Sequence, residues 1–142
     1  MQYAYKPGEL ERLKKTELEI FAAFVAICEK YDLPYFLNGG TAIGAVRHQG
    51  FIPWDDDIDI GFLRKDYDRF LALAKEELSD KYEVLNAMED RNYPLPTTRL
   101  VKKGTVFHEE PLKNCKCNFG IFLDLYSFDN AADDEKAMRK QG

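Results

Sequence analysis

The feature that most constrains this chain is an acidic run, Asp55-Asp56-Asp57-Ile58-Asp59, in which four carboxylates fall within five residues. Its alternation with apolar residues predicts a strand that places Asp55, Asp57 and Asp59 on one face and the isoleucines on the other. Side chains two residues apart on a strand lie roughly 6.5–7 Å apart, and two carboxylates at that distance repel by roughly 2.5 kcal/mol at an effective dielectric of about 20. A hard divalent cation with oxygen ligands, Mg²⁺ first, is the simplest way to offset this repulsion.

A solvated acidic turn is the alternative interpretation, because most acidic runs are turns. The apolar alternation, the neighbouring Phe51 and Trp54, and a Gly-Gly-Thr segment upstream favour a metal site instead. A calcium loop of the EF-hand type, starting at Asp55, requires Gly at its sixth position and Glu at its twelfth. Those positions hold Ile60 and Asp66, so the sequence excludes an EF-hand.

A glycine-containing turn precedes the acidic run. A short apolar strand leads into Asn38–Thr41, and Thr41 is expected to cap a helix over residues 42–48. Glycine lets the backbone approach a ligand closely, and the free N–H groups of a helix N-terminus bind phosphate. Gly39, Gly40 and Thr41 are therefore candidate phosphate ligands, although a plain turn explains the two glycines about as well.

Three charged residues near this turn have more than one interpretation. Arg47, at the end of the predicted helix, is a candidate ligand for a substrate phosphate; balancing the helix C-terminus or a nearby aspartate is the equal alternative. Asp55 joins the metal-binding face if the strand begins early. Asp56 is expected to cap a turn or to pair with Arg47.

A further aspartate stands in the middle of a strongly apolar strand pattern over residues 120–126. This residue is Asp124, and an unpaired buried carboxylate is costly. It therefore needs a partner. A cation shared with Asp57 and Asp59 is one solution, and a salt bridge to a buried arginine such as Arg99 is the other.

The remaining segments predict a fold of mixed helices and strands. Helical patterns cover 8–31 and 64–78, and we interpret the first of these helices as a packing element without chemistry. Strand patterns cover 35–37, 82–85, 97–101, 105–108 and 120–126. The strands over 97–101 and 105–108 are expected to form a hairpin, and a helix is expected to begin in the polar segment after residue 128.

Composition excludes several classes of protein. The net charge of −5 argues against non-specific binding of nucleic acid, and the 142 residues, 45% of them hydrophobic, suit one soluble domain with a core. We find no apolar run long enough for a membrane span and no signal peptide, so we expect a cytoplasmic protein. Cys28, Cys115 and Cys117 match no common zinc spacing and are expected to be reduced thiols.

The segment from Asn38 to Gly61, NGGTAIGAVRHQGFIPWDDDIDIG, resembles the signature of the LicD family. This family of phosphocholine transferases belongs to the nucleotidyltransferase superfamily and is related to the fukutin group. Asp66-Tyr67, the segment Gly120–Leu125 and Asp129 are also similar to that family, so the resemblance extends over roughly residues 13–129.

The resemblance implies an α+β fold, with a nucleotidyltransferase-like mixed β-sheet and packed helices. It implies a transferase that moves phosphocholine from a CDP-linked donor, CDP-choline, to a glycan acceptor such as a sugar of lipopolysaccharide or teichoic acid. Relatives in the fukutin group use CDP-ribitol. Because family members usually continue well beyond the third aspartate, we expect residues 1–142 to be a single domain that lacks the usual C-terminal extension.

Carried over to this chain, the family's metal-binding pair is Asp57 and Asp59, its third carboxylate is Asp124, and the segment Gly39–Thr41 holds the donor phosphates. Two Mg²⁺ ions, with Mn²⁺ as the second candidate, would polarise the donor diphosphate. Asp124 would bind one metal and accept the proton of the attacking sugar hydroxyl. Two alternatives stay open: transfer of a whole nucleotide to a hydroxyl or amine, and a metal- or nucleotide-binding fragment without turnover.

Overall fold

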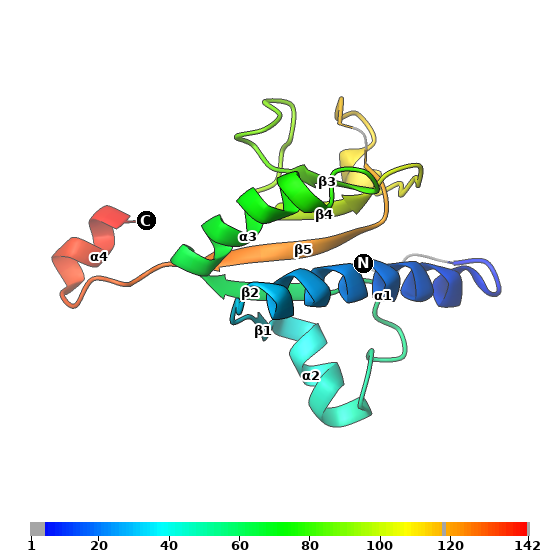
Figure 1. The fold of residues 1–142 in the computed structure, drawn as a ribbon, viewed down its shortest axis with the longest axis horizontal. Helices are drawn as coiled ribbons and strands as arrows, with labels where there is room; N and C mark the ends of the chain where they lie inside the picture. Colours follow the sequence, from blue (N-terminus) through cyan, green and yellow to red (C-terminus); the bar gives the residue numbers. More distant parts are fainter. Residues whose placement is uncertain (1–4, 118, 142) are drawn as a thin grey trace.

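A computed structural model of the chain describes residues 5–117 and 119–141. Its elements in chain order are α1 (Glu9–Lys30), β1 (Phe36–Leu37), α2 (Gly39–His48), β2 (Asp59–Leu63), α3 (Arg64–Glu77), β3 (Tyr82–Leu85), β4 (Thr98–Lys102), the 3-10 helix η1 (Glu110–Leu112), β5 (Phe122–Phe128) and α4 (Glu135–Gln141). Figure 1 shows α1 and α3 lying across the strands, with α4 beyond the end of β5. The predicted α+β class is confirmed.

The five strands form one mixed sheet in the order β1-β2-β5-β4-β3. Strands β2 and β5 are parallel, and the other neighbouring pairs are antiparallel. At the centre of the sheet, Asp124 of β5 has Asp59 of β2 as its register partner on one side and Arg99 of β4 on the other. The topology thus places three charged residues side by side on three neighbouring strands.

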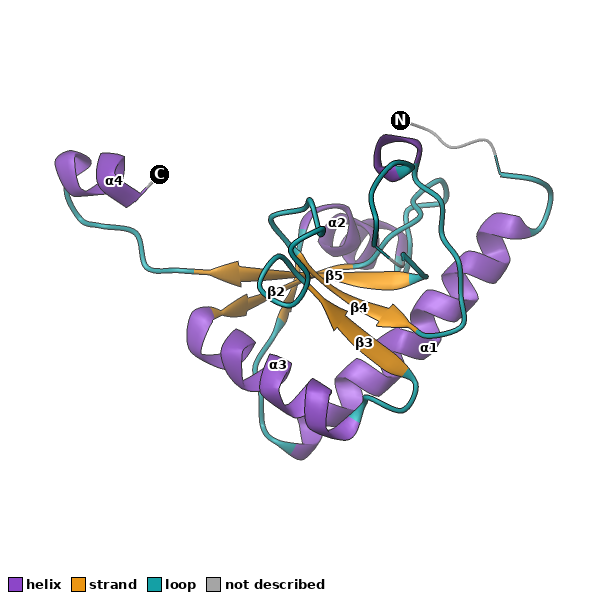
Figure 2. Cartoon of the chain, turned by 90° about the horizontal axis from the view of Figure 1, so that it is seen from above, coloured by secondary structure: helices purple, strands orange, loops and turns teal. Residues whose placement is uncertain are grey.

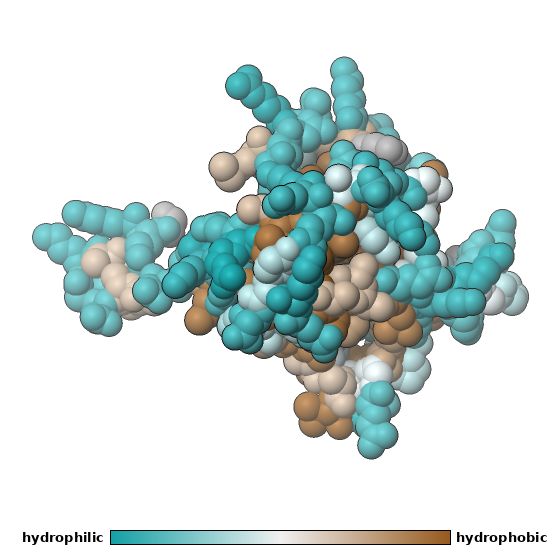
Figure 3. Space-filling model, in the orientation of Figure 1, coloured by the Kyte–Doolittle hydropathy of each residue, from teal (hydrophilic) through white to brown (hydrophobic). Residues whose placement is uncertain are grey.

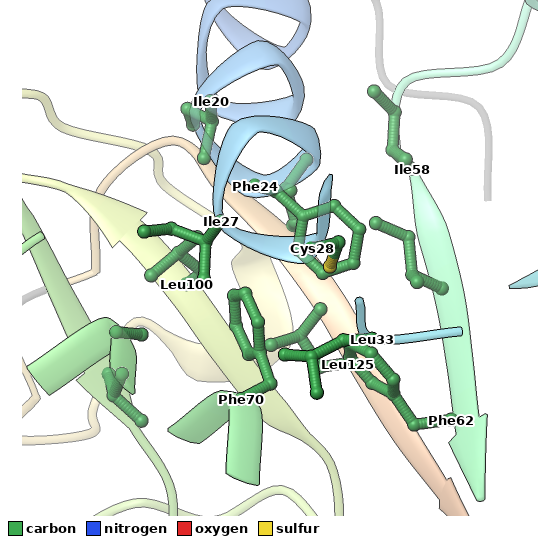
Figure 4. Close-up of a cluster of buried hydrophobic side chains, with 14 residues drawn as sticks. Ile20, Phe24, Ile27, Cys28, Leu33, Ile58, Phe62, Phe70, Leu100 and Leu125 are labelled. Carbon is green, nitrogen blue, oxygen red and sulfur yellow. The ribbon is translucent and has the colours of Figure 1, made fainter. Parts of the chain in front are cut away.

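The main core lies between the sheet and the pair of helices α1 and α3, which Figure 2 shows on the same side of the strands. The buried ring of Phe24 on α1 lies 4.8 Å from that of Phe70 on α3 and 5.6 Å from that of Phe62 on β2. Figure 4 shows these rings meeting Ile20, Leu100 and other apolar side chains in one cluster. Burial of each such side chain contributes about 1.5–3 kcal/mol, so this cluster fixes α1 against the sheet.

Helix α2 is held by contacts with the segment that follows it. A Cβ at Gly44 would lie 2.4 Å from the carbonyl oxygen of Gly50, so only glycine permits this close approach. The N–H of Gly50 donates to the carbonyl of Gly44 across the same contact. This crossing turns the chain back over α2 and directs the acidic run toward the sheet.

Two details of the predicted secondary structure are wrong. Residues 105–108 are not a strand, because β4 already has β3 on one side and β5 on the other and offers no edge to a hairpin partner. The strand expected over the acidic run begins only at Asp59, where its pairing with Asp124 of β5 starts; the N–H of Asp55 is instead bonded in a turn to the carbonyl of Ile52. Within the part of the chain that the structure describes, every helix is too short or too polar to cross a lipid bilayer.

Candidate functional site: an aspartate triad at the centre of the sheet

Asp57, Asp59 and Asp124 converge at one end of the central strand pair. Each offers a carboxylate oxygen, and the three oxygens lie within 4.8 Å of one another. The parallel register of β2 and β5 sets Asp59 directly beside Asp124, and the N–H of Asp124 donates to the carbonyl of Ile58 at 3.0 Å. The structure therefore brings together the three carboxylates that the sequence singled out; we call them the aspartate triad.

Asp55 lies beside this triad in a second group of carboxylates. Oxygens of Asp55, Asp56 and Asp57 also lie within 4.8 Å of one another, so Asp57 belongs to both groups. The N–H of Asp55 donates to the carbonyl of Ile52 at 2.9 Å, and this turn replaces the strand expected there. Asp55 thus approaches the triad through a turn, and its role as a metal ligand stays a prediction.

The first turn of α2 lies against the acids. The helix begins at Gly39, three residues earlier than predicted, and the hydroxyl of Thr41 accepts a hydrogen bond from the N–H of Asp59 at 2.9 Å instead of capping the helix. A Cβ at Gly40 would lie 2.8 Å from Oδ2 of Asp55, and one at Gly39 would lie 3.7 Å from Oδ2 of Asp59. The two glycines therefore let the start of a helix sit directly beside the carboxylates.

Burial and mutual repulsion make the triad hard to ionise. Burial, followed by the charges of Asp59 and Asp55, raises the pKa of Asp57 to about 8. Burial and the neighbouring Asp124 raise the pKa of Asp59 to about 6, although a hydrogen bond from the hydroxyl of Tyr126 opposes the rise. A cation would favour the ionised forms of these closely spaced carboxyl groups, so the site is suited to binding one.

Asp124 has a second partner on the other side. Nε of Arg99 donates to Oδ1 of Asp124 at 3.2 Å, and Nη1 of Arg99 donates to Glu109 at 2.6 Å. Burial raises the pKa of Asp124, while the arginine works against that rise. The predicted salt bridge between Asp124 and Arg99 is therefore confirmed, and a cation shared with Asp57 and Asp59 stays a prediction.

Glu17 of α1 is an acidic residue that the sequence reasoning missed. Its side chain is 1% exposed, and its Oε2 has no hydrogen-bond partner among the described residues. Burial, followed by the charges of Asp57, Asp56 and Asp55, raises its pKa to about 9. The sequence does contain a sign of this burial, because Glu17 follows Leu13 by four residues and so lies on the apolar stripe of α1.

The structure places Arg47 and Asp56, which the sequence offered as an ion pair, in different surroundings. The carboxylate of Asp56 accepts a hydrogen bond at 2.5 Å from the hydroxyl of Tyr5, a residue of the N-terminal segment. Arg47 is exposed in the last turn of α2, about 9 Å along the helix axis from Thr41. Its role as a phosphate ligand stays a prediction.

The chemistry of the triad fits Mg²⁺. All three side chains offer carboxylate oxygens, the ligands that this ion prefers, and ligands on opposite sides of Mg²⁺ lie about 4.2 Å apart. The separation of up to 4.8 Å between the oxygens of the triad requires only small side-chain movements to reach that geometry. A divalent cation would also relieve the repulsion that raises the pKa values of Asp57 and Asp59.

Comparisons with known proteins show the family to which the chain is related. Residues 32–135 match the family model described as "LicD/FKTN/FKRP, nucleotidyltransferase domain". The chain is 49% identical over 123 residues to the lipopolysaccharide cholinephosphotransferase LicD of Haemophilus influenzae; the match covers 85% of this chain and 44% of that protein. The chain thus spans less than half the length of this relative.

Two human proteins match over shorter segments. The ribitol 5-phosphate transferase FKRP is 43% identical over 42 residues, which cover 30% of this chain and 8% of that protein. The ribitol-5-phosphate transferase FKTN is 28% identical over 69 residues, which cover 49% of this chain and 15% of that protein. The family model covers well over half of the chain and includes all the residues of the triad, so the chain belongs to the LicD/FKTN/FKRP nucleotidyltransferase-domain family.

Proposed function

We propose that this chain is a metal-dependent phosphotransferase. It moves phosphocholine, or a similar phospho-alcohol, from a CDP-linked donor to a sugar hydroxyl of a cell-surface glycan. The names of the relatives support the class of reaction, because LicD of Haemophilus influenzae is a cholinephosphotransferase and FKRP and FKTN are ribitol-phosphate transferases. The convergence of the aspartate triad beside the first turn of α2 is the observation that carries the proposal.

Mg²⁺, or Mn²⁺ as the second candidate, would be held by the triad and would polarise the donor diphosphate while neutralising charge in the transition state. The N–H groups at the start of α2, from Gly39 to Thr41, point the positive end of the helix dipole at the donor phosphates. These groups orient the phosphate next to the carboxylates without adding a charged side chain.

Asp124 receives the proton of the attacking hydroxyl. Its hydrogen bond from Arg99 fixes the orientation of the carboxylate, so that one oxygen can face the attacking hydroxyl. As the sugar oxygen bonds to the phosphorus of the head group, the bond from that phosphorus to the bridging oxygen of the donor breaks. CMP leaves with the electron pair of that bond.

A thermal melt with Mg²⁺ and each of CDP-choline, CTP and CDP-ribitol tests this proposal on the native chain, on Asp57→Asn and on the exposed control Asp80→Asn. Ligand at about one hundred times its dissociation constant stabilises the folded state by about 2.7 kcal/mol. We expect a Mg²⁺-dependent rise of several degrees with CDP-choline in the native chain and the control, and none in Asp57→Asn. A rise with CTP alone would favour nucleotidyl transfer instead. An equal rise with CDP-choline in Asp57→Asn would show that the triad does not bind the Mg²⁺–donor complex.

A further inference from the structure

A cavity of about 260 Å³ opens between α1, α2 and the segment that leads into the acidic run. We call it the α1–α2 cavity; residues on its wall include Phe21, Thr41, Ala45, Phe51, Asp55 and Ile58. On the face shown in Figure 3, apolar side chains gather over α2 and the region where it meets α1. The wall combines two aromatic rings and aliphatic groups with one carboxylate, and its other polar side chains are those of Thr41 and Gln49.

Both aromatic rings are fixed in place. Phe21 stacks on Phe24 with ring centroids 5.9 Å apart and meets the edge of Tyr35 at 6.3 Å. Phe51 already receives one cation, because Nζ of Lys14 lies 5.2 Å from its ring centroid. That ammonium is held by a 2.8 Å hydrogen bond to the carbonyl of Pro53. The cavity therefore has rigid aromatic walls, one of which is positioned to accept positive charge.

The α1–α2 cavity borders the candidate site. Thr41 and Asp55 both line it, and both also contact the acids: Thr41 through its bond to the N–H of Asp59, and Asp55 through the carboxylate group that it shares with Asp57. A donor whose phosphates lie between the triad and the start of α2 would place the adjoining head group in this cavity.

We propose that the α1–α2 cavity binds the quaternary ammonium head group of the donor, an inference that rests on the proposed function. A trimethylammonium group carries positive charge but no N–H donors, so aromatic and aliphatic walls with a single carboxylate match its chemistry. A polyol head group would lose hydrogen bonds to water against the same walls. The cavity thus selects choline over ribitol.

Binding of CDP-choline and of its neutral isostere, in which carbon replaces the ammonium nitrogen, tests the proposal by titration calorimetry with Mg²⁺. Two variants change the cavity: Phe51→Leu removes an aromatic ring, and Ala45→Trp fills the cavity from an exposed position of α2. They are compared with the native chain and with the matched control Phe107→Leu, a residue of the second hydrophobic cluster. A thermal melt establishes that each variant is folded.

We expect the native chain and Phe107→Leu to bind CDP-choline about 5- to 30-fold more tightly than the isostere, the range of a desolvated cation–π contact. In Phe51→Leu this ratio falls several-fold but stays above one, because the carboxylate of Asp55 still attracts the ammonium. Ala45→Trp binds both donors at least tenfold more weakly while CMP binding is unchanged. Equal affinity of the native chain for the two donors would overturn the head-group site and leave the proposed function standing. If CMP and both donors fail to bind, the proposed function falls and the head-group site falls with it.

Discussion

Asp59 and Asp124 are register partners on the parallel strands β2 and β5, although they lie in distant parts of the sequence. This pairing places two partly buried carboxylates side by side, and Asp57 adds a third whose oxygen lies within 4.8 Å of theirs. The fold therefore keeps an electrostatically unfavourable arrangement at the centre of its sheet. The cation that we propose for this site would offset the repulsion, and its effect on stability can be measured.

The first prediction concerns metal removal. Mg²⁺ should raise the melting temperature more at pH 8.5 than at pH 5, because the cation needs ionised ligands and the pKa values of Asp59 and Asp57 are raised to about 6 and about 8. Asp59→Asn should lose the Mg²⁺ effect yet melt at or above the native temperature in EDTA, since one repelling charge is gone. Melting curves in EDTA and in Mg²⁺ measure both effects. A larger Mg²⁺ effect at pH 5 would contradict this account.

The second prediction concerns Glu17, whose folded-state pKa of about 9 exceeds its ordinary value of 4.5. Between these values only the folded state holds the proton, so without divalent cations stability is full below about pH 4.5 and falls as the pH rises toward 9. One such proton changes the free energy of unfolding by at most about 1.4 kcal/mol per pH unit. Glu17→Gln, which mimics the protonated form, should match the native chain near pH 4.5 and become progressively more stable above it.

Denaturant titrations of both proteins at pH 5, 7 and 8.5 give the free energies of unfolding. The exposed Glu76 provides the matched control, since Glu76→Gln should follow the native pH profile. A difference between Glu17→Gln and the native chain that stays constant from pH 5 to pH 8.5 would show that Glu17 is ionised in the folded protein.

The third prediction concerns the close contact between Gly40 and Asp55. A Cβ at position 40 would lie 2.8 Å from Oδ2 of Asp55, so Gly40→Ala should displace that carboxylate. The end of an aspartate side chain moves easily, and alanine favours the helix by about 1 kcal/mol, so the melting temperature should stay or rise. Affinity for the Mg²⁺–donor complex should nevertheless fall about tenfold.

Asp80→Asn is the control, because Asp80 is exposed and lies outside the candidate site; Gly50, where an added Cβ would meet nothing within 4 Å, is unsuitable because it lines the α1–α2 cavity. Calorimetric titration with Mg²⁺ and CDP-choline measures the affinity of each variant. Native affinity in Gly40→Ala would show that Asp55 is not needed at its present position.

The fourth prediction concerns the buried bridge from Arg99 to Asp124 and Glu109. Arg99→Met leaves two carboxylates without their cation and should destabilise the protein by about 3–5 kcal/mol. Arg64→Met is the comparison, because Arg64 pairs with Asp129 at the surface and its loss should cost less than about 1 kcal/mol. Urea unfolding of the two variants gives these free energies, and equal losses would mean that burial adds nothing at Arg99.

Much of the fold and of the site could be predicted from the sequence. The apolar periodicity of α1 and α3, and the isolated acid in the apolar strand β5, located the core and the third carboxylate. Which residues lie beside Asp124 depends on the order of the strands in the sheet, and no local sequence pattern predicts that order. Arg99 and Asp59 flank Asp124 only because β4 and β2 are its neighbours in the sheet.

The surroundings of Glu17 and Tyr5 could not be predicted from the sequence, because they depend on tertiary contacts. Glu17 sits on an apolar stripe of a helix that was interpreted as packing alone, and only the approach of the acidic run to α1 makes it part of the site. Tyr5 lies in an N-terminal segment without a pattern, yet its hydroxyl contacts Asp56. The α1–α2 cavity likewise arises from three segments whose relative placement the sequence does not show.

Product analysis by ³¹P NMR, with the chain, Mg²⁺, CDP-choline and a lipopolysaccharide acceptor that lacks phosphocholine, tests the central claim most directly. The account predicts release of CMP together with a new phosphodiester signal on the glycan, both lost in Asp124→Asn and retained in Asp80→Asn. Release of pyrophosphate from CTP with transfer of the nucleotide would contradict phosphocholine transfer. Binding of CDP-choline without release of CMP would contradict catalysis by this chain and leave a nucleotide-binding module.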